Sequence, residues 1–228
     1  MVESSVLGAG PWEQSAPRRA PVQARSRQRV VALLDAAERL VVRRGVEALT
    51  TREIAEAAGV PVASLYQYFA DKEGVLLALA ERHMSEMDEQ TVADLQAARA
   101  QGPLSVADLV EVSMRSFVKV YLRRRAFVEI YLRGRTNPAV HAYGREHNKR
   151  IAATLRELAV DDGLARADLP ETAAVLAVEL GDRIFQLAFE HDDHGDAAII
   201  EEGIVLLTSY LERYQSGAQD EHQPRNHQ

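Results

Sequence analysis

Residues 51–69, TREIAEAAGVPVASLYQYF, gather side chains that are suited to hydrogen bonding with another polymer. Arg52 and Gln67 have the side-chain geometry that pairs with base edges, with Arg favouring guanine and Gln favouring adenine. Nearby hydroxyl groups and one positive charge are suited to phosphate oxygens. These groups belong to Thr51, Ser64, Tyr66, Tyr68 and Lys72. The chemistry indicated is contact with the bases and backbone of double-stranded DNA.

Two short helices around Gly59 must position these side chains. Thr50, followed three residues later by Glu53, has the form of a capping box that opens the first helix, and Gly59 ends it. The second helix is predicted over 62–69 and starts with small side chains that allow close approach to a major groove. Those residues are Val62, Ala63 and Ser64. The spacing is that of a helix-turn-helix, although a helical hairpin within another α fold would share it.

The stretch ALTTREIAEAAGVPVASLYQYFADKEGVLLAL lies in a segment, 27–80, that resembles the DNA-binding domain of the TetR (tetracycline repressor) family of bacterial regulators. The resemblance implies an all-α homodimer whose first three helices bind operator DNA and whose later helices sense a ligand and dimerise. It implies phosphate contacts for Thr51, Tyr66, Tyr68 and Lys72. It implies base contacts for Arg52, Ala63, Ser64 and Gln67. Pro61 and Val62 depart from the polar or basic residues often found at their positions, so hydrogen-bonded base reading is expected to be sparse.

A basic segment precedes this motif. Residues 18–44 contain eight Arg against Asp35 and Glu38, a local balance of +6 in a chain whose net charge is −7. Arg25 and Arg27 are expected to enter the adjacent minor groove or to lie along phosphates, from an arm just before the first helix. A solubilising tail is the alternative interpretation of the same charges.

The composition indicates an ordinary soluble protein. Its 228 residues are 46% hydrophobic, which is enough for a proper core. The chain has no cysteine, no apolar run long enough to cross a membrane and no apolar signal region, so we expect a cytoplasmic protein without membrane contact. It also lacks a glycine-rich phosphate loop and any suggestive Ser, His and Asp spacing, so no enzymatic activity is expected.

Helical periodicity and capping residues predict an all-α fold of about nine helices. The first helix is expected to end at Gly45, and Asp71 is expected to cap a long fourth helix that Gly102 and Pro103 end. Helix starts are also indicated at Ser105 with Asp108, at Asn137 and at Asp168. Later helices are expected at about 105–124, 125–133, 138–159, 170–192 and 196–215.

These elements divide into four predicted regions. A disordered arm spans 1–24, and a helix-turn-helix DNA-binding domain spans 25–71. A larger helical domain for ligand binding and dimerisation spans 72–216, and a disordered tail spans 217–228.

A small-molecule pocket is expected in the larger domain, because aromatic side chains gather on its middle helices. The candidate lining residues are Met114, Phe117, Tyr121, Phe127, Tyr131 and Tyr143. Packing in the core is the competing interpretation for each of them. Five nearby arginines, at 123–125, 133 and 135, make an anionic ligand conceivable, but a solvated basic face is favoured. The identity of the effector is not predicted.

The last two helices are apolar over more than one stripe, which exceeds what a single core face needs. The excess predicts a second buried surface formed with the same helices of a partner subunit. The candidate interface residues are Leu180, Ile184, Leu187, Ile200, Leu207 and Leu211. A helix pair buried centrally in a monomer is the alternative.

No metal or other cofactor is expected. His191, Asp192, Asp193 and His194 resemble metal ligands but are interpreted as a polar connector, since no further ligand has a fitting spacing. The leading hypothesis is therefore a repressor that binds a palindromic operator as a homodimer and is released by a small-molecule effector. The alternatives are an activator, a helical interaction scaffold without an effector, and an enzyme that carries a DNA-binding head.

Overall fold

The computed structural model describes residues 20–134 and 137–217, with side chains described from Arg25 onward. The described part is all-α, as predicted, and its only β-type pairing is one isolated bridge between Ala165 and Gln215. Its elements are α1 (Ala20–Arg44), α2 (Thr51–Ala57), α3 (Val62–Leu65), α4 (Lys72–Arg99), α5 (Val106–Arg123), α6 (Arg125–Phe127), the π-helical turn η1 (Val128–Leu132), α7 (Pro138–Asp161), α8 (Glu171–Ala188) and α9 (Ala197–Glu212).

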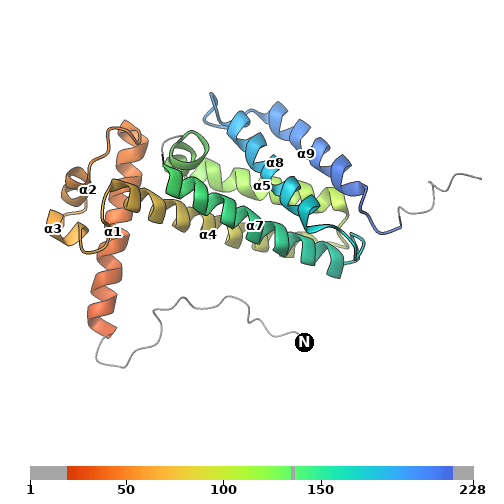
Figure 1. The fold of residues 1–228 in the computed structure, drawn as a ribbon, viewed down its shortest axis with the longest axis horizontal. Helices are drawn as coiled ribbons and strands as arrows, with labels where there is room; N and C mark the ends of the chain where they lie inside the picture. Colours follow the sequence, from red (N-terminus) through yellow and green to blue (C-terminus); the bar gives the residue numbers. More distant parts are fainter. Residues whose placement is uncertain (1–19, 135–136, 218–228) are drawn as a thin grey trace, which may run out of the picture.

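The helices form a small head and a longer body (Figure 1). α1, α2 and α3 lie together at one end, and α4 starts beside them and runs along the body. α5 and α7 pack on α4, and α8 and α9 cover α5 and α7. The head is joined to the body through the contacts of α1 with α4 and α6. Any movement within the body must therefore reach the head through these helices.

Buried apolar side chains of the head, which are continuous with the core of the body, fix the turn between α2 and α3. Ile54, Ala55 and Leu65 are fully buried in this core. Gly59 has φ +68°, a left-handed conformation that glycine adopts at little cost. The Val60 N–H then donates to the Ala55 carbonyl at 3.0 Å. This closed turn sets the angle at which α3 leaves α2.

Side-chain caps fix where several body helices begin, as predicted. Asp71 accepts a backbone N–H at 2.8 Å at the start of α4. Ser105 and Asp108 form a reciprocal capping box at the start of α5. Asn137 accepts two backbone N–H groups, each at 3.1 Å, at the start of α7. Each cap satisfies donors that have no partner within the helix, so these starts are decided by local sequence.

Two boundary predictions near the head were wrong. α1 begins at Ala20, so Arg25 and Arg27 lie on the helix and not on an arm that precedes it. Pro21 falls in the first turn, where a missing N–H costs no helical hydrogen bond. α3 ends at Leu65, and residues 66–68 continue as a turn. The rest of the predicted arm, 1–19, and residues 218–228 of the predicted tail lie outside the described residues.

Two further predictions in the body were wrong. The segment expected as a helix over 125–133 is the short α6 followed by η1. The expected cap Asp168 does not bond the start of α8; Pro170 occupies the N-cap position, and Asp168 instead lies 3.1 Å from the Arg166 Nε. The remaining body helices begin and end within four residues of the predicted positions.

Candidate functional site

The predicted base-reading residues gather on the outer side of α2 and α3. Arg52, Ala63 and Gln67 are exposed, while Ser64 is half-buried. Val62 is also half-buried and packs against the apolar core, so its side chain is only partly available to a ligand. This part of the chain therefore presents both small side chains and two long polar ones, Arg52 and Gln67.

A pair of hydroxyl groups connects α2 to the turn after α3. The Thr51 Oγ1 and the Tyr66 hydroxyl lie 3.0 Å apart, and Tyr66 is 53% exposed. Each oxygen keeps further hydrogen-bonding capacity, because a hydroxyl both donates and accepts. This pair holds two of the predicted phosphate-contacting groups side by side on the exposed surface.

The start of α1 is tied to the same surface. The Ser26 hydroxyl donates to the Tyr68 hydroxyl at 3.1 Å. Arg25 and Arg27 flank this bond and are exposed. On the other side, the Lys72 Nζ lies 3.5 Å from the Val46 carbonyl, close to the first turn of α4. Basic groups of α1 and of α4 therefore accompany the candidate DNA-binding residues.

A network of ion pairs joins the head to the body. Arg82 of α4 reaches Asp35 at 2.7 Å and Glu38 at 2.5 Å, both on α1. Arg124, between α5 and α6, reaches Glu86 of α4 at 2.7 Å and Glu38 at 3.5 Å. The network spans three elements, so it resists a change in the angle between α1 and α4.

The fully buried His83 lies within this network. Neither ring nitrogen has a hydrogen-bond partner, but Nε2 lies 3.7 Å from a Glu38 oxygen and Nδ1 lies 3.9 Å from a Glu86 oxygen. The ring lies 5.5 Å from that of Phe127. Burial, together with the nearby positive charges of Arg82 and Arg124, lowers the pKa of His83 to about 4. The imidazole is therefore neutral at physiological pH.

The arginines that suggested an anionic ligand have protein partners. Arg123 and Arg124 both bind Glu86. Arg133 binds Glu129 at 2.6 Å and Asp193 at 2.8 Å. Asp193 belongs to the loop that the sequence suggested as a weak metal site, and the described residues hold no group of three potential metal ligands. Arg135 lies outside the described residues.

Four of the six predicted pocket residues do not line the cavity. Tyr121, Phe127 and Tyr131 form a buried stack, with ring centroids 5.5 Å and 5.4 Å apart along the row. Tyr143 is half-buried, with the Arg150 guanidinium 5.4 Å from its ring centre. These aromatics fill the end of the body nearest the head, where they support α4 and α6 through packing.

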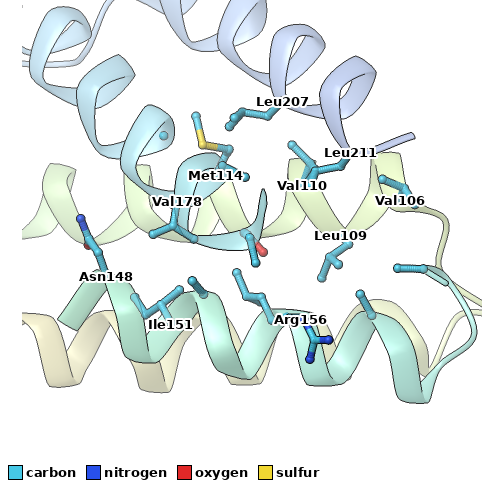
Figure 2. A pocket seen from close by; sticks show the side chains of 18 of the residues that line it. Val106, Leu109, Val110, Met114, Asn148, Ile151, Arg156, Val178, Leu207 and Leu211 are labelled. Carbon is cyan, nitrogen blue, oxygen red and sulfur yellow. The ribbon is translucent and has the colours of Figure 1, made fainter. Parts of the chain in front are cut away.

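The cavity lies farther from the head, between α5, α7, α8 and α9, and has a volume of about 110 Å³ (Figure 2). Met114 and Phe117 line it, as predicted. Most of the other walls come from α7 and α8. The sequence prediction included α7 only through Tyr143, which does not line the cavity, and did not include α8. Small residues at helical spacing on α8 were the available signal, since Ala174, Ala177 and Gly181 leave the space open.

The cavity is apolar, although a few polar residues belong to its wall. Asn148 of α7 donates to Glu179 at 3.3 Å, and Asp182 of α8 accepts from the Gln186 side chain at 2.9 Å. Burial raises the pKa of Asp182 to about 6, against the lowering effect of a hydrogen bond from Tyr131. The Ser113 hydroxyl is buried in the cavity wall and has no hydrogen-bond partner.

The predicted dimer face is only partly on the outside of the chain. Ile200 and Leu207 are 5% and 4% exposed, because they pack into the core of their own chain. Their assignment to a subunit interface is therefore corrected. Leu180, Ile184 and Leu211 are half-buried against that core, and Leu187 is 41% exposed. The exposed apolar side chains of α8 and α9 are Leu176, Leu187, Val205 and Leu206.

The chain belongs to the TetR family of transcriptional regulators, which bind DNA through a helix-turn-helix. The family model described as "Bacterial regulatory proteins, tetR family" matches residues 33–79. A second model, "Tetracyclin repressor-like, C-terminal domain", matches residues 105–211. Together they cover the head and most of the body, and the resemblance of the helix-turn-helix to this family is confirmed. No described helix has the length and hydropathy that a membrane span needs.

Individual relatives agree with this assignment. The uncharacterised HTH-type regulator YvkB of Bacillus subtilis (strain 168) is 44% identical over 66 residues, 28% of this chain and 35% of the relative. BetI of Rhizobium meliloti (strain 1021) is 38% identical over 85 residues, which are 37% of this chain and 41% of the relative. Both matches span less than half of the curated relatives. A TetR-family regulator of Streptomyces coelicolor is similar in structure at a TM-score of 0.60, with 27% identity over 82% of this chain and 99% of that one.

Proposed function

We propose that the protein is a ligand-responsive repressor. As a homodimer in the cytoplasm it binds a palindromic operator, and a small molecule in the α5–α9 cavity releases it. The observation that carries the proposal is that one chain has both exposed side chains suited to base edges, Arg52 on α2 and Gln67 in the turn after α3, and an apolar cavity in the body. No catalytic role is proposed for any residue.

Each proposed contact with DNA follows from the chemistry of an exposed or half-buried side chain. Arg52 and Gln67 read base edges, and Val62, Ala63 and Ser64 allow close approach and contact thymine methyl groups. Phosphates bind the hydroxyl pair of Thr51 and Tyr66, and also Tyr68 and Lys72, while Arg25 and Arg27 bind the flanking backbone from α1.

The cavity is coupled to the head through α4. Asn148 lines the cavity, and the neighbouring His147 lies 2.9 Å from Asp88 of α4. On α5, Ser116 donates to Asp94 of α4 at 2.7 Å. A ligand that separates α5 from α7 therefore displaces α4. The two heads of a dimer must stand about one DNA turn apart, roughly 34 Å, so a small tilt of α4 weakens operator binding.

The cavity also favours a ligand-responsive regulator over a scaffold that has no effector, because an unfilled apolar space costs packing energy that a ligand recovers. Whether binding represses or activates a gene depends on where the operator lies relative to its promoter. Expression from an operator-containing reporter, measured with and without the regulator, distinguishes the two.

Selection of bound sequences from random duplex DNA tests the proposal, and two substitutions sharpen it. Gln67→Ala should relax the preference at one base pair by roughly 1–3 kcal/mol and leave the other positions unchanged.

Lys72→Ala should weaken binding to all sequences alike and reduce the salt dependence by about one counterion, since a phosphate contact carries no base information. Fluorescence anisotropy over a range of salt concentrations measures both effects.

Gln96→Ala and Lys149→Ala are matched controls, because both side chains are exposed on body helices away from the head. Neither should change affinity, sequence preference or salt dependence. Equal losses on selected and random DNA for Gln67→Ala would remove that residue from the base-reading set. Failure of the unchanged protein to enrich any sequence would overturn the proposed operator binding.

A further inference from the structure

Two polar side chains of the cavity wall, Asn148 and Arg156 of α7, are already bonded to the protein. The Asn148 amide donates to Glu179 at 3.3 Å. The Arg156 Nε donates to the Leu169 carbonyl at 2.7 Å. Figure 2 shows the nitrogens of both side chains at the margin of the cavity. A ligand could bond these donors in the cavity only at the expense of bonds that the chain already makes.

The other polar side chains of the wall are also paired or covered. Asp182 of α8 accepts from the Gln186 side chain at 2.9 Å. The Ser113 oxygen of α5 is buried beneath protein atoms, so a molecule in the cavity does not reach it. The Tyr214 side chain is hydrogen-bonded to that of Tyr210. The surface that the wall presents to a ligand is therefore almost entirely apolar.

The cavity is also small. Its volume is about 110 Å³, whereas an apolar cavity of about 150 Å³ stays dry and binds benzene or xenon. On α8 the space is left by Ala174, Ala177 and Gly181, which recur at helical spacing along one side of the helix. Around Gly181 the walls close, since a Cβ atom there would lie 3.6 Å from the Met114 Sδ and 3.7 Å from the Leu207 Cδ1. A single carbon ring matches this volume, and a fused ring system exceeds it.

An apolar cavity of this kind selects its ligand by what the ligand lacks. A hydroxyl or amino group gives up its hydrogen bonds to water when it enters and gains no replacement from the wall. A charged group loses more, because its hydration is stronger. A hydrocarbon surface loses no hydrogen bond and gains from leaving water.

We propose that the cavity binds a compact, uncharged hydrocarbon of about the size of one benzene ring, without hydroxyl, amino or carboxyl groups. This inference rests on the proposed function only in taking the cavity as the effector site. Ala177 and Gly181 set the upper limit on ligand size, because the volume missing from their side chains keeps the space open.

Calorimetric titration of the full-length protein with toluene, phenol, benzoate and naphthalene tests the inference. Toluene and phenol have the same shape and differ in a methyl group against a hydroxyl group. Phenol should bind at least about tenfold more weakly than toluene, because its hydroxyl finds no partner. Benzoate, which is charged, should bind more weakly still. Naphthalene should also bind more weakly than toluene, although it has more apolar surface to bury, because it does not fit.

Two cavity substitutions test the site. Ala177→Leu places three further carbon atoms in the space and should weaken toluene binding at least about tenfold. Gly181→Ala adds one carbon atom at ordinary contact distance, so the fold is kept, and toluene should lose more affinity than benzene. Ala97→Leu is the matched control, since Ala97 is exposed on α4 and does not line the cavity. Thermal unfolding of each variant shows that it is folded.

The inference is overturned if toluene does not bind or if phenol or benzoate binds as tightly as toluene. It is also overturned if Ala177→Leu and Gly181→Ala, both folded, leave the affinity for toluene unchanged. Operator release is measured separately, by anisotropy of labelled DNA. Toluene binding without operator release would refute the proposed effector role of the cavity and leave the inference about the ligand standing.

Discussion

A Leu206→Glu variant should be monomeric at concentrations where the unchanged protein is a dimer. Leu206 is 51% exposed on α9, next to the exposed Val205, and the neighbouring α8 exposes Leu176 and Leu187. In a two-fold dimer the substitution occurs twice, and each glutamate is transferred from water into an apolar interface without a partner. We expect the dissociation constant of the dimer to rise at least about a hundredfold, since each unpaired charge costs several kcal/mol.

Light scattering after size-exclusion chromatography measures the subunit state. The same variant should bind a palindromic operator no more tightly than a single half-site, because only a dimer places two heads on one duplex. Val92→Glu is the matched control: Val92 is 50% exposed, but it lies on α4, which packs on α5 and α7. If Val92→Glu dissociates the dimer and Leu206→Glu does not, the subunit interface lies elsewhere.

The sequence predicted those parts of the fold that local interactions decide. Ser105 with Asp108 and Asn137 mark helix starts because each side chain bonds a backbone group within three residues. Gly59 marks the turn between α2 and α3 because its φ of +68° is costly for other residues. Asp168 has the same residue type as a cap and yet pairs with Arg166, so composition alone does not distinguish a cap from an ion pair.

Properties that depend on tertiary packing were not predictable in the same way. α9 has apolar residues on most of its circumference, and periodicity does not tell which of them meet their own chain. The structure buries Ile200 and Leu207 and leaves Val205 and Leu206 exposed. Likewise, the aromatic residues of α5 and η1 were predicted to line a pocket, but Tyr121 packs on other aromatic rings. The cavity lies instead where α8 has alanine and glycine. A cavity forms where several neighbouring side chains are too small to fill the space between helices, so the type of a single residue does not predict it.

The ion pairs that join the head to the body could not be predicted from the sequence for a similar reason. Arg82 and Arg124 are far in sequence from Glu38 of α1, with which both pair, so the sequence alone shows no ion pair between them. In the folded chain their charges are matched by Glu38 and Glu86. The basic neighbourhood that suggested an anionic effector is therefore part of the joint between head and body.

Two buried titratable groups should give opposite pH dependences of stability, which nearly cancel in the unchanged protein. His83 has a folded pKa of about 4, below its ordinary value, so it binds fewer protons when folded, and stability rises from pH 4 to about 6.5. Asp182 has a folded pKa of about 6, above its ordinary value, so it binds more protons when folded, and stability falls from about pH 4 to 6. Each contribution is about 3 kcal/mol at 1.36 kcal/mol per pKa unit.

Single substitutions should reveal each contribution. In His83→Leu the free energy of unfolding should fall by about 2 kcal/mol as the pH rises from 4 to 6, because the Asp182 contribution is then no longer offset by that of His83. In Asp182→Asn it should rise by about the same amount over this range. At neutral pH His83→Leu should be as stable as the unchanged protein or more stable by about 1–2 kcal/mol, since it removes two buried nitrogens that lack partners.

Urea unfolding at fixed protein concentration, repeated across this pH range, measures these slopes, and the fixed concentration keeps any contribution from dimerisation constant. Subtracting the unchanged protein from each variant removes the contribution of carboxylates whose pKa is lowered by ion pairs, such as Glu86 and Asp94. Parallel curves for His83→Leu and the unchanged protein would mean that His83 titrates normally in the folded state. The imidazole would then have to be reached by water, and the joint between α1, α4 and α6 would be looser than the close packing around His83 indicates.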